Sequence, residues 1–251
     1  PHLGANGHLA AVHNGIIENH AALRAHVLAQ GRRCLSETDS EVVVQLVEAA
    51  LEYGADLETA VRQTLALVQG ASAFVFVSAH APDRLVAARL GHAGGLVLGL
   101  GDGETFVASD LPALLAHTRR VVFLEDGQLA VVTAQGVHLS RLDGTPVEPR
   151  VHLAPWDPTA ATKEPYPHFM LKEIHEQAQA VTDTLRGRAD FEAGRVRLEG
   201  LALTAQGARA LERLVIVACG TSAYAGLVGK FIIERLARLP VEVDYASEFR
   251  Y

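Results

Sequence analysis

Three short segments of this 251-residue chain carry side chains that could do chemistry. One is Cys219-Gly220-Thr221-Ser222, which follows an apolar run and precedes a helical pattern. A turn from a buried strand into a helix leaves N–H groups unpaired at the positive end of the helix dipole, where a phosphate can bind. An ordinary N-cap at Thr221 or Ser222 explains the same residues equally well. Because G-x-G-x-x-G and P-loop patterns are missing from this turn, a sugar phosphate suits it better than a nucleotide.

The second segment is His13-Asn14-Gly15, and the third is Ser36-Glu37-Thr38-Asp39. An asparagine amide beside a glycine N–H offers two donors to an oxyanion, and glycine allows a substrate to approach closely. Asn-Gly is also the strongest hairpin-turn dipeptide, and the residues alone favour the turn. Asp39 could pair with a substrate ammonium, although an acid at a helix start usually serves the helix dipole.

Composition bounds the remaining chemistry. The two cysteines, Cys34 and Cys219, lack C-x-x-C spacing, which predicts no disulfide and fits a reducing cytoplasm. Cys34 lies in a short apolar run without a neighbouring base, which is typical of a structural buried thiol. The twelve histidines form no helical pair, so a metal site has weak support. A net charge of −7 without a basic tract argues against nucleic acid, and no apolar run reaches the roughly 18 residues of a membrane span.

Hydrophobic periodicity predicts helices first and strands afterwards. Helices are expected over 19–31, from Thr38 to about Gly54 with a Thr38–Glu41 capping box, and over 56–70. The apolar faces of the first two helices should contain Leu23, Val27, Leu28, Val43, Leu46, Val47, Ala50 and Leu51. Strands are expected over 72–79, 84–90, 95–100, 105–109, 120–125, 128–133 and 137–142, with a short helix over 111–117. Hairpin-type turns are expected at Glu125-Asp126-Gly127 and Asp143-Gly144, and the whole pattern indicates α+β layering.

The composition changes in the second half. Six prolines between 146 and 167 indicate a linker, and 168–188 reads as an amphipathic helix. A buried strand ending in the Gly-Thr-Ser turn, a helix over 224–239 and a strand over 240–247 make one βαβ unit of a doubly wound domain. The inner face of its helix should contain Leu227, Val228, Phe231, Ile232 and Leu236.

The segments VHNGIIENH, SETDSE, HFMLKEIHEQ, ACGTS and ASEFRY, in this order and spacing, resemble the glutamine–fructose-6-phosphate aminotransferase (isomerizing) family, the glucosamine-6-phosphate synthases. The resemblance implies an N-terminal-nucleophile glutaminase domain, an αββα sandwich, over 1–148. A linker over 149–171 and the start of a sugar isomerase domain over 172–251 would follow. The family uses ammonia from glutamine to convert fructose 6-phosphate into glucosamine 6-phosphate, with no metal or organic cofactor. It also implies a cytoplasmic homodimer of the full-length protein.

By the same resemblance, Asn14 and Gly15 match the oxyanion hole, and Gly15 and Asp39 lie near the glutamine α-amino group. Gly220, Thr221 and Ser222 match residues that bind the sugar phosphate. The chain departs from the family at its ends, because Pro1 lies beyond the family's N-terminal cysteine nucleophile and most of the isomerase domain is missing. Ala178 also replaces a usual proline. The fragment itself is therefore expected to be inactive in both half-reactions.

Two other functions fit parts of this pattern. One is another class II amidotransferase, such as a phosphoribosyl amidotransferase or an asparagine synthetase, which would predict a nucleotide or phosphoribosyl motif downstream. The other is a sugar-phosphate-binding regulatory module with a non-functional glutaminase half. A Met-Cys-Gly start in the parent gene would favour the enzyme over the binding module.

Overall fold

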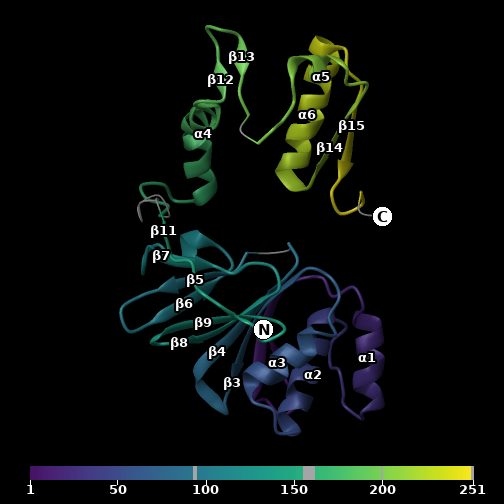
Figure 1. The fold of residues 1–251 in the computed structure, drawn as a ribbon, viewed down its shortest axis with the longest axis vertical. Helices are drawn as coiled ribbons and strands as arrows, with labels where there is room; N and C mark the ends of the chain where they lie inside the picture. The colour runs from purple at the N-terminus through teal and green to yellow at the C-terminus, as the bar shows by residue number, and fades with distance from the viewer. Residues whose placement is uncertain (93–94, 155–161, 199, 250–251) are drawn as a thin grey trace. The chain divides into compact units, whose positions relative to one another are not determined.

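A computed structural model describes residues 1–92, 95–154, 162–198 and 200–249. The chain forms two compact units, Pro1–Lys172 and Glu173–Tyr251 (Figure 1). Prolines 155 and 158 of the expected linker lie outside the described residues.

The first unit contains two antiparallel sheets. The larger has the strand order β1-β2-β3-β4-β8-β9-β10, formed by β1 (His2–Leu3), β2 (Leu9–Gly15), β3 (Ser72–Ser78), β4 (Ala81–Leu90), β8 (Gln128–Thr133), β9 (Gly136–Arg141) and β10 (Pro146–Val147). The smaller has the order β11-β7-β5-β6, formed by β11 (His152–Leu153), β7 (Arg120–Phe123), β5 (Val97–Leu100) and β6 (Thr105–Ala108).

Alternation along β3 sends side chains into two separate cores. Phe74 and Phe76 pack with the apolar faces of α1 (His20–Ala29), α2 (Asp39–Glu52) and α3 (Leu57–Leu65) on one side of the larger sheet. Ala73 and Val75 face the smaller sheet, where they join a cluster that includes Leu96, Leu98, Val122 and Leu124. The result is a helix–sheet–sheet arrangement, with the helices against one face of the larger sheet (Figure 1).

The expected second helical layer of the αββα sandwich is reduced in the described residues. The expected helix over 111–117 is only the 3₁₀ turn η1 (Leu111–Ala113), followed by turn residues. A segment this short gains too few intrahelical hydrogen bonds to offset helix nucleation. It still buries Leu111, Leu114 and Leu115 against Val97 and Val121 of the smaller sheet.

Two turn predictions have different outcomes. The turn at Asp143-Gly144 does join the antiparallel pair β9 and β10. The hairpin at Glu125-Asp126-Gly127 is wrong, because β7 lies in the smaller sheet and β8 in the larger one. This turn carries the chain between sheets, since each flanking strand finds its partners elsewhere. The start of the expected linker also forms structure, as β11 pairs with β7.

The predicted apolar faces of the helices are closer to the structure than the predicted helix ends. Leu23 and Val27 are buried, but Leu28, in the last turn of α1, is exposed. The Thr38–Glu41 capping box is wrong, since Thr38 makes no side-chain cap hydrogen bond. The Glu41 carboxylate instead accepts from the backbone N–H groups of Leu35 and Ser36, both at 2.6 Å. The third helix ends at Leu65 rather than near 70.

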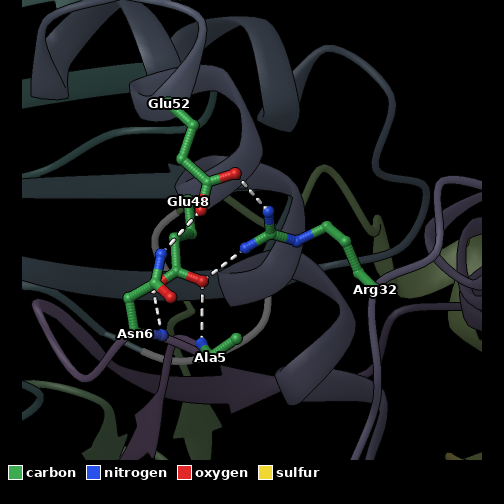
Figure 2. Close-up of polar contacts among 5 residues, drawn as sticks. All are labelled: Ala5, Asn6, Arg32, Glu48 and Glu52. Atoms are coloured by element: carbon green, nitrogen blue, oxygen red, sulfur yellow. Dashed lines mark hydrogen bonds and ion pairs between the residues drawn. The ribbon is translucent and has the colours of Figure 1, made fainter.

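A buried carboxylate fastens the β1–β2 turn to α2 (Figure 2). Glu48 accepts hydrogen bonds from the N–H groups of Ala5 at 2.7 Å and Asn6 at 3.1 Å, and it pairs with Arg32. Arg32 also pairs with Glu52 at 2.7 Å, and Glu52 accepts from the Asn6 amide at 2.7 Å. The turn approaches so closely that a Cβ on Gly4 would lie 2.1 Å from Glu48 Oε1.

The second unit contains α4 from Glu173 onward (the whole helix is Phe169–Leu185), a hairpin of β12 (Ala189–Asp190) and β13 (Arg195–Val196), and α5 (Ala205–Arg209). The expected βαβ follows as β14 (Leu214–Ala218), α6 (Gly220–Ala237) and β15 (Val241–Tyr245), with the two strands parallel. The predicted inner face of α6 is wrong: Leu227, Val228, Phe231, Ile232 and Leu236 are all exposed. Ala223 and Gly226 contact the sheet instead, because only small residues allow the helix to lie this close to Ile216.

Candidate functional site

Asn14-Gly15 ends a strand rather than forming a hairpin turn. Asn14 pairs with Ala73 and Gly15 with Ser72 in the β2–β3 ladder. The three helices α1, α2 and α3 lie between these two strands in the sequence. The turn that the dipeptide alone favoured is therefore wrong. Both Asn14 and Gly15 are exposed at this end of the sheet.

Gly15 occupies a position that other residues cannot easily take. Its φ is +136°, and an added Cβ would lie 2.3 Å from the carbonyl oxygen of Ala71. Beyond it the two chains remain joined, as Ile16 N–H donates to Ala71 O at 3.2 Å and Glu18 N–H donates to Gln69 O at 2.9 Å. The backbone after Asn14 is thus fixed against the segment that precedes β3.

The Asn14 side chain faces a cavity of about 240 Å³ between the two sheets. Its lining comes from β2, β3, the start of β5 and the end of β6: Val12, His13, Asn14, Ala73, Val75, Gly95, Leu96, Val107, Ala108 and Ser109. A cavity of this volume has room for a small molecule. Gly15 is not part of this lining.

Asp39 reaches the same end of the sheet from a different element. It is the first residue of α2, and its Oδ2 accepts from the N–H of Ile17 at 2.8 Å, two residues beyond Gly15. A carboxylate at this position is also stabilised by the helix dipole. The structure therefore brings Asn14, Gly15 and Asp39 to the same end of the sheet, although Gly15 and Asp39 are 24 positions apart in sequence.

His13, which sequence reasoning did not select as a site residue, connects these groups. Its Nδ1 lies 2.8 Å from Ser40 Oγ, its Nε2 lies 3.1 Å from Ser72 Oγ, and its ring stacks on Phe74 at 4.3 Å. Burial lowers the pKa of His13 despite the attraction of Asp39, and His2 lowers it further. The only sequence signal was its place beside Asn14, because both serine partners are distant in the chain.

Cys34 fits the structural interpretation of its sequence context. It packs against the core of the helical side, and burial raises the pKa of its thiol while Arg24 works in the opposite direction. A thiol with a raised pKa is a poor nucleophile at neutral pH.

The Cys219–Ser222 turn lies in the second unit, at the start of α6. The N-cap of the helix is Cys219, without a side-chain hydrogen bond, so the alternative that Thr221 or Ser222 is the N-cap does not hold. Gly220 has a φ of +59°, and Gly220, Thr221 and Ser222 are all exposed. The first N–H groups of an 18-residue helix are thus accessible without a competing side-chain cap.

Neither a metal-binding cluster nor a membrane-spanning helix is found among the described residues. No group of three or more histidine, cysteine, aspartate or glutamate side chains is placed to hold a metal ion there. Within the same residues, no helix has both the length and the apolar content needed to cross a bilayer.

Comparison with known proteins identifies the relatives of this chain. Residues 1–116 match the glutamine amidotransferase domain family. All 251 residues align at 50% identity with glutamine–fructose-6-phosphate aminotransferase (isomerizing) of Symbiobacterium thermophilum and at 47% with that of Thermus thermophilus. The chain is homologous to the glutamine–fructose-6-phosphate aminotransferases. It spans 41% and 40% of the length of these two aminotransferases.

The fold comparison agrees with the match to the amidotransferase domain family. A solved glutamine phosphoribosylpyrophosphate amidotransferase from B. subtilis, in complex with ADP and GMP, matches with a TM-score of 0.50 and 17% identity. The match covers 94% of this chain and 45% of that one. At this identity the likeness shows the fold alone, which is that of the N-terminal-nucleophile amidotransferases.

Proposed function

We propose that this chain is the part of a glutamine–fructose-6-phosphate aminotransferase that binds glutamine and begins the sugar isomerase domain. The full-length protein would release ammonia from glutamine and use it to convert fructose 6-phosphate into glucosamine 6-phosphate. Glutamine and fructose 6-phosphate are its proposed substrates, and a cytoplasmic homodimer its proposed form. The observation that carries this proposal is the similarity along the whole chain to aminotransferases of that name.

The arrangement of Asn14, Gly15 and Asp39 supports the glutamine half. In this proposal, glutamine enters the cavity beside Asn14, whose amide N–H₂ donates to the oxyanion formed when the side-chain amide is attacked. The N–H of Gly15 would be the second donor, and Asp39 would pair with the α-ammonium group. Donors held in place by the β2–β3 ladder need no reorganisation as the negative charge develops.

The turn before α6 supports the sugar half. The accessible N–H groups at the start of the helix and the hydroxyls of Thr221 and Ser222 would bind the phosphate of fructose 6-phosphate. The isomerase character of 172–251 and the domain boundaries at 148 and 171 remain predictions. The inactivity of the chain by itself also remains a prediction.

A chimera tests the function directly. The 251 aligned residues of the S. thermophilum aminotransferase are replaced by this chain, and glutamate and glucosamine 6-phosphate are both quantified. Both products should form with a kcat/KM within about tenfold of the parent, equivalent to about 1.4 kcal/mol in activation free energy. A folded chimera that releases no glutamate contradicts the glutaminase half. Glutamate without glucosamine 6-phosphate contradicts the sugar half.

Within this chimera, Asn14→Ala tests the oxyanion role. Removing one such donor should lower the glutaminase kcat by about 10²–10³. Asn6→Ala is the matched control, because Asn6 belongs to the same unit but interacts with Glu52, away from the cavity. A loss below about threefold for Asn14→Ala would reject the role, since it lies far outside the range for such donors.

A further inference from the structure

Four side chains form a continuous hydrogen-bonded chain across three elements of the first unit. Ser72 of β3 lies 3.1 Å from His13 Nε2, His13 Nδ1 lies 2.8 Å from Ser40 Oγ, and Ser40 Oγ lies 3.3 Å from Asp39 Oδ1. This series of hydrogen bonds begins at Ser72, which pairs with Gly15 in the β2–β3 ladder. It ends at the Asp39 carboxylate, which accepts a hydrogen bond from the N–H of Ile17.

The direction of every proton in this chain follows from donor and acceptor capacity. The ionised Asp39 carboxylate only accepts, so Ser40 uses its single hydroxyl proton to donate to Oδ1. Ser40 Oγ must then accept from His13, which places the proton of the neutral imidazole on Nδ1. His13 Nε2 is left as an acceptor, and Ser72 donates to it.

We infer that His13 is a positioning residue that locks the Asn14 end of β2 to the Asp39 end of α2. The inference rests on the proposed function, because it assigns His13 a purpose in the glutamine site. His13 need not touch the substrate, since it acts by holding the oxyanion donor at a fixed distance from the carboxylate. Stacking on Phe74 at an interplanar angle of 10° fixes the plane of the ring, so both nitrogens point at their serines.

The surroundings of His13 keep it in the neutral form that this role requires. The charged groups that act on it are Asp39 on α2, which favours protonation, and His2 on β1, which opposes it. The strand β3 contributes only the uncharged Ser72 and Phe74. Protonation would turn Nε2 into a donor facing the fully buried Ser72 hydroxyl, which would have to give up donating to the ring.

The first experiment reads the ring directly in the 251-residue chain. Nitrogen NMR of ¹⁵N-histidine-labelled protein above the ordinary histidine pKa of about 6.5 should show His13 as the Nδ1–H tautomer. Ser72→Ala should reduce the population of this tautomer. Ser78→Ala is the matched control, because Ser78 is a buried serine of the same strand that instead accepts from His80 N–H at 3.2 Å. An Nε2–H tautomer, or a tautomer unaffected by Ser72→Ala, overturns the proposed chain.

The second experiment measures glutaminase kinetics in the chimera described above. His13→Phe keeps a ring against Phe74 but removes both hydrogen bonds, and it should lower kcat/KM by about 10- to 100-fold. His117→Phe is the control, because His117 also stacks on a phenylalanine but lies exposed near Phe106. It should stay within about twofold of the parent.

His13→Asn separates positioning from general support of the fold. The asparagine N–H₂ can still donate to Ser40 but cannot reach Ser72, so the KM for glutamine should return towards the parent value while kcat stays low. Its activity should also lose the decline that the parent shows as His13 becomes protonated at low pH. If His13→Phe and His13→Asn change kcat and KM by the same factors and leave the pH profile unchanged, the role of His13 is merely structural.

Failure of the inference and failure of the function can be told apart. If Asn14→Ala reduces kcat as expected but His13→Phe changes kcat/KM by less than about twofold, only the inference fails. If the NMR tautomer is as expected and Asn14→Ala has no effect, the glutamine site itself is wrong.

Discussion

In the first unit, Phe74 and Phe76 are buried between the larger sheet and its helices, whereas Phe231 of α6 in the second unit is 68% exposed. Both kinds of segment have the apolar content of core elements. Of the buried apolar residues among those described, only Ala223 and Val241 belong to the second unit. The difference lies in the available partners, since a sheet of seven strands presents a broad apolar face and the pair β14–β15 does not.

This contrast shows what an amphipathic pattern can and cannot specify. The periodicity of α6 correctly predicts a helix with an apolar stripe, but burial of that stripe requires a surface to cover it. The helix instead packs its small residues on the strands, where Gly226 permits close approach to Ile216. Its larger apolar residues remain exposed among the described residues.

The largest expected difference comes from matched truncations of two phenylalanines. Phe76→Ala should lower the free energy of unfolding of the first unit by about 4 kcal/mol, because it creates a cavity in a packed core. Phe231→Ala should change that of the second unit by less than about 0.5 kcal/mol. Native-state hydrogen exchange of peptides from β3 and α6 measures both values. Similar losses for both variants would contradict the proposed difference in packing.

A second pair of variants tests the contribution of the buried Glu48 carboxylate to the stability of the first unit. Glu48→Gln should cost about 3 kcal/mol, because it leaves the largely buried Arg32 without its main partner. Glu52→Gln removes the other partner of Arg32, but the Glu52 side chain is 46% exposed and the cost should stay below about 1 kcal/mol. Urea unfolding curves provide both values, and equal costs would mean that burial of Glu48 adds nothing.

The smallest expected effect is a pH dependence confined to the first unit. Since the pKa of His13 is lowered by folding, the unfolded chain takes up the proton first, and stability falls as the pH drops below about 6.5. His13→Phe should flatten the stability curve in this window and leave the second unit unchanged.

Glu41 gives a second change of stability, at lower pH, which serves as the internal control. Burial acts to raise the pKa of Glu41, but hydrogen bonds from the Ser36 hydroxyl and the N–H groups of Leu35 and Ser36 lower it overall. Its contribution is therefore present above the ordinary carboxyl pKa and is lost as the pH falls below it. This loss should persist in His13→Phe, and its disappearance would mean that the two groups are coupled.

Sequence patterns correctly predicted the three N-terminal helices, most of the strands that follow them and the later βαβ unit. The glutamine-site residues suggested by resemblance remain a prediction. Local periodicity and turn chemistry are properties of neighbouring residues, so positions such as Val43, Leu46 and Val47 could be assigned to a core without coordinates. The five separated motifs likewise indicated a resemblance to the aminotransferases, and the similarity to relatives of that name extends over all 251 residues.

Which of these elements contact one another became clear from the three-dimensional structure. Asn14-Gly15 looked like a hairpin turn because the sequence hides its partner Ala73, which lies beyond three helices. Glu125–Gly127 looked like a hairpin because the strands on either side do not reveal that they join different sheets. His13 likewise gained its two serines only through long-range pairing. Contacts between distant segments depend on the relative position of whole elements, and short-range patterns do not contain that information.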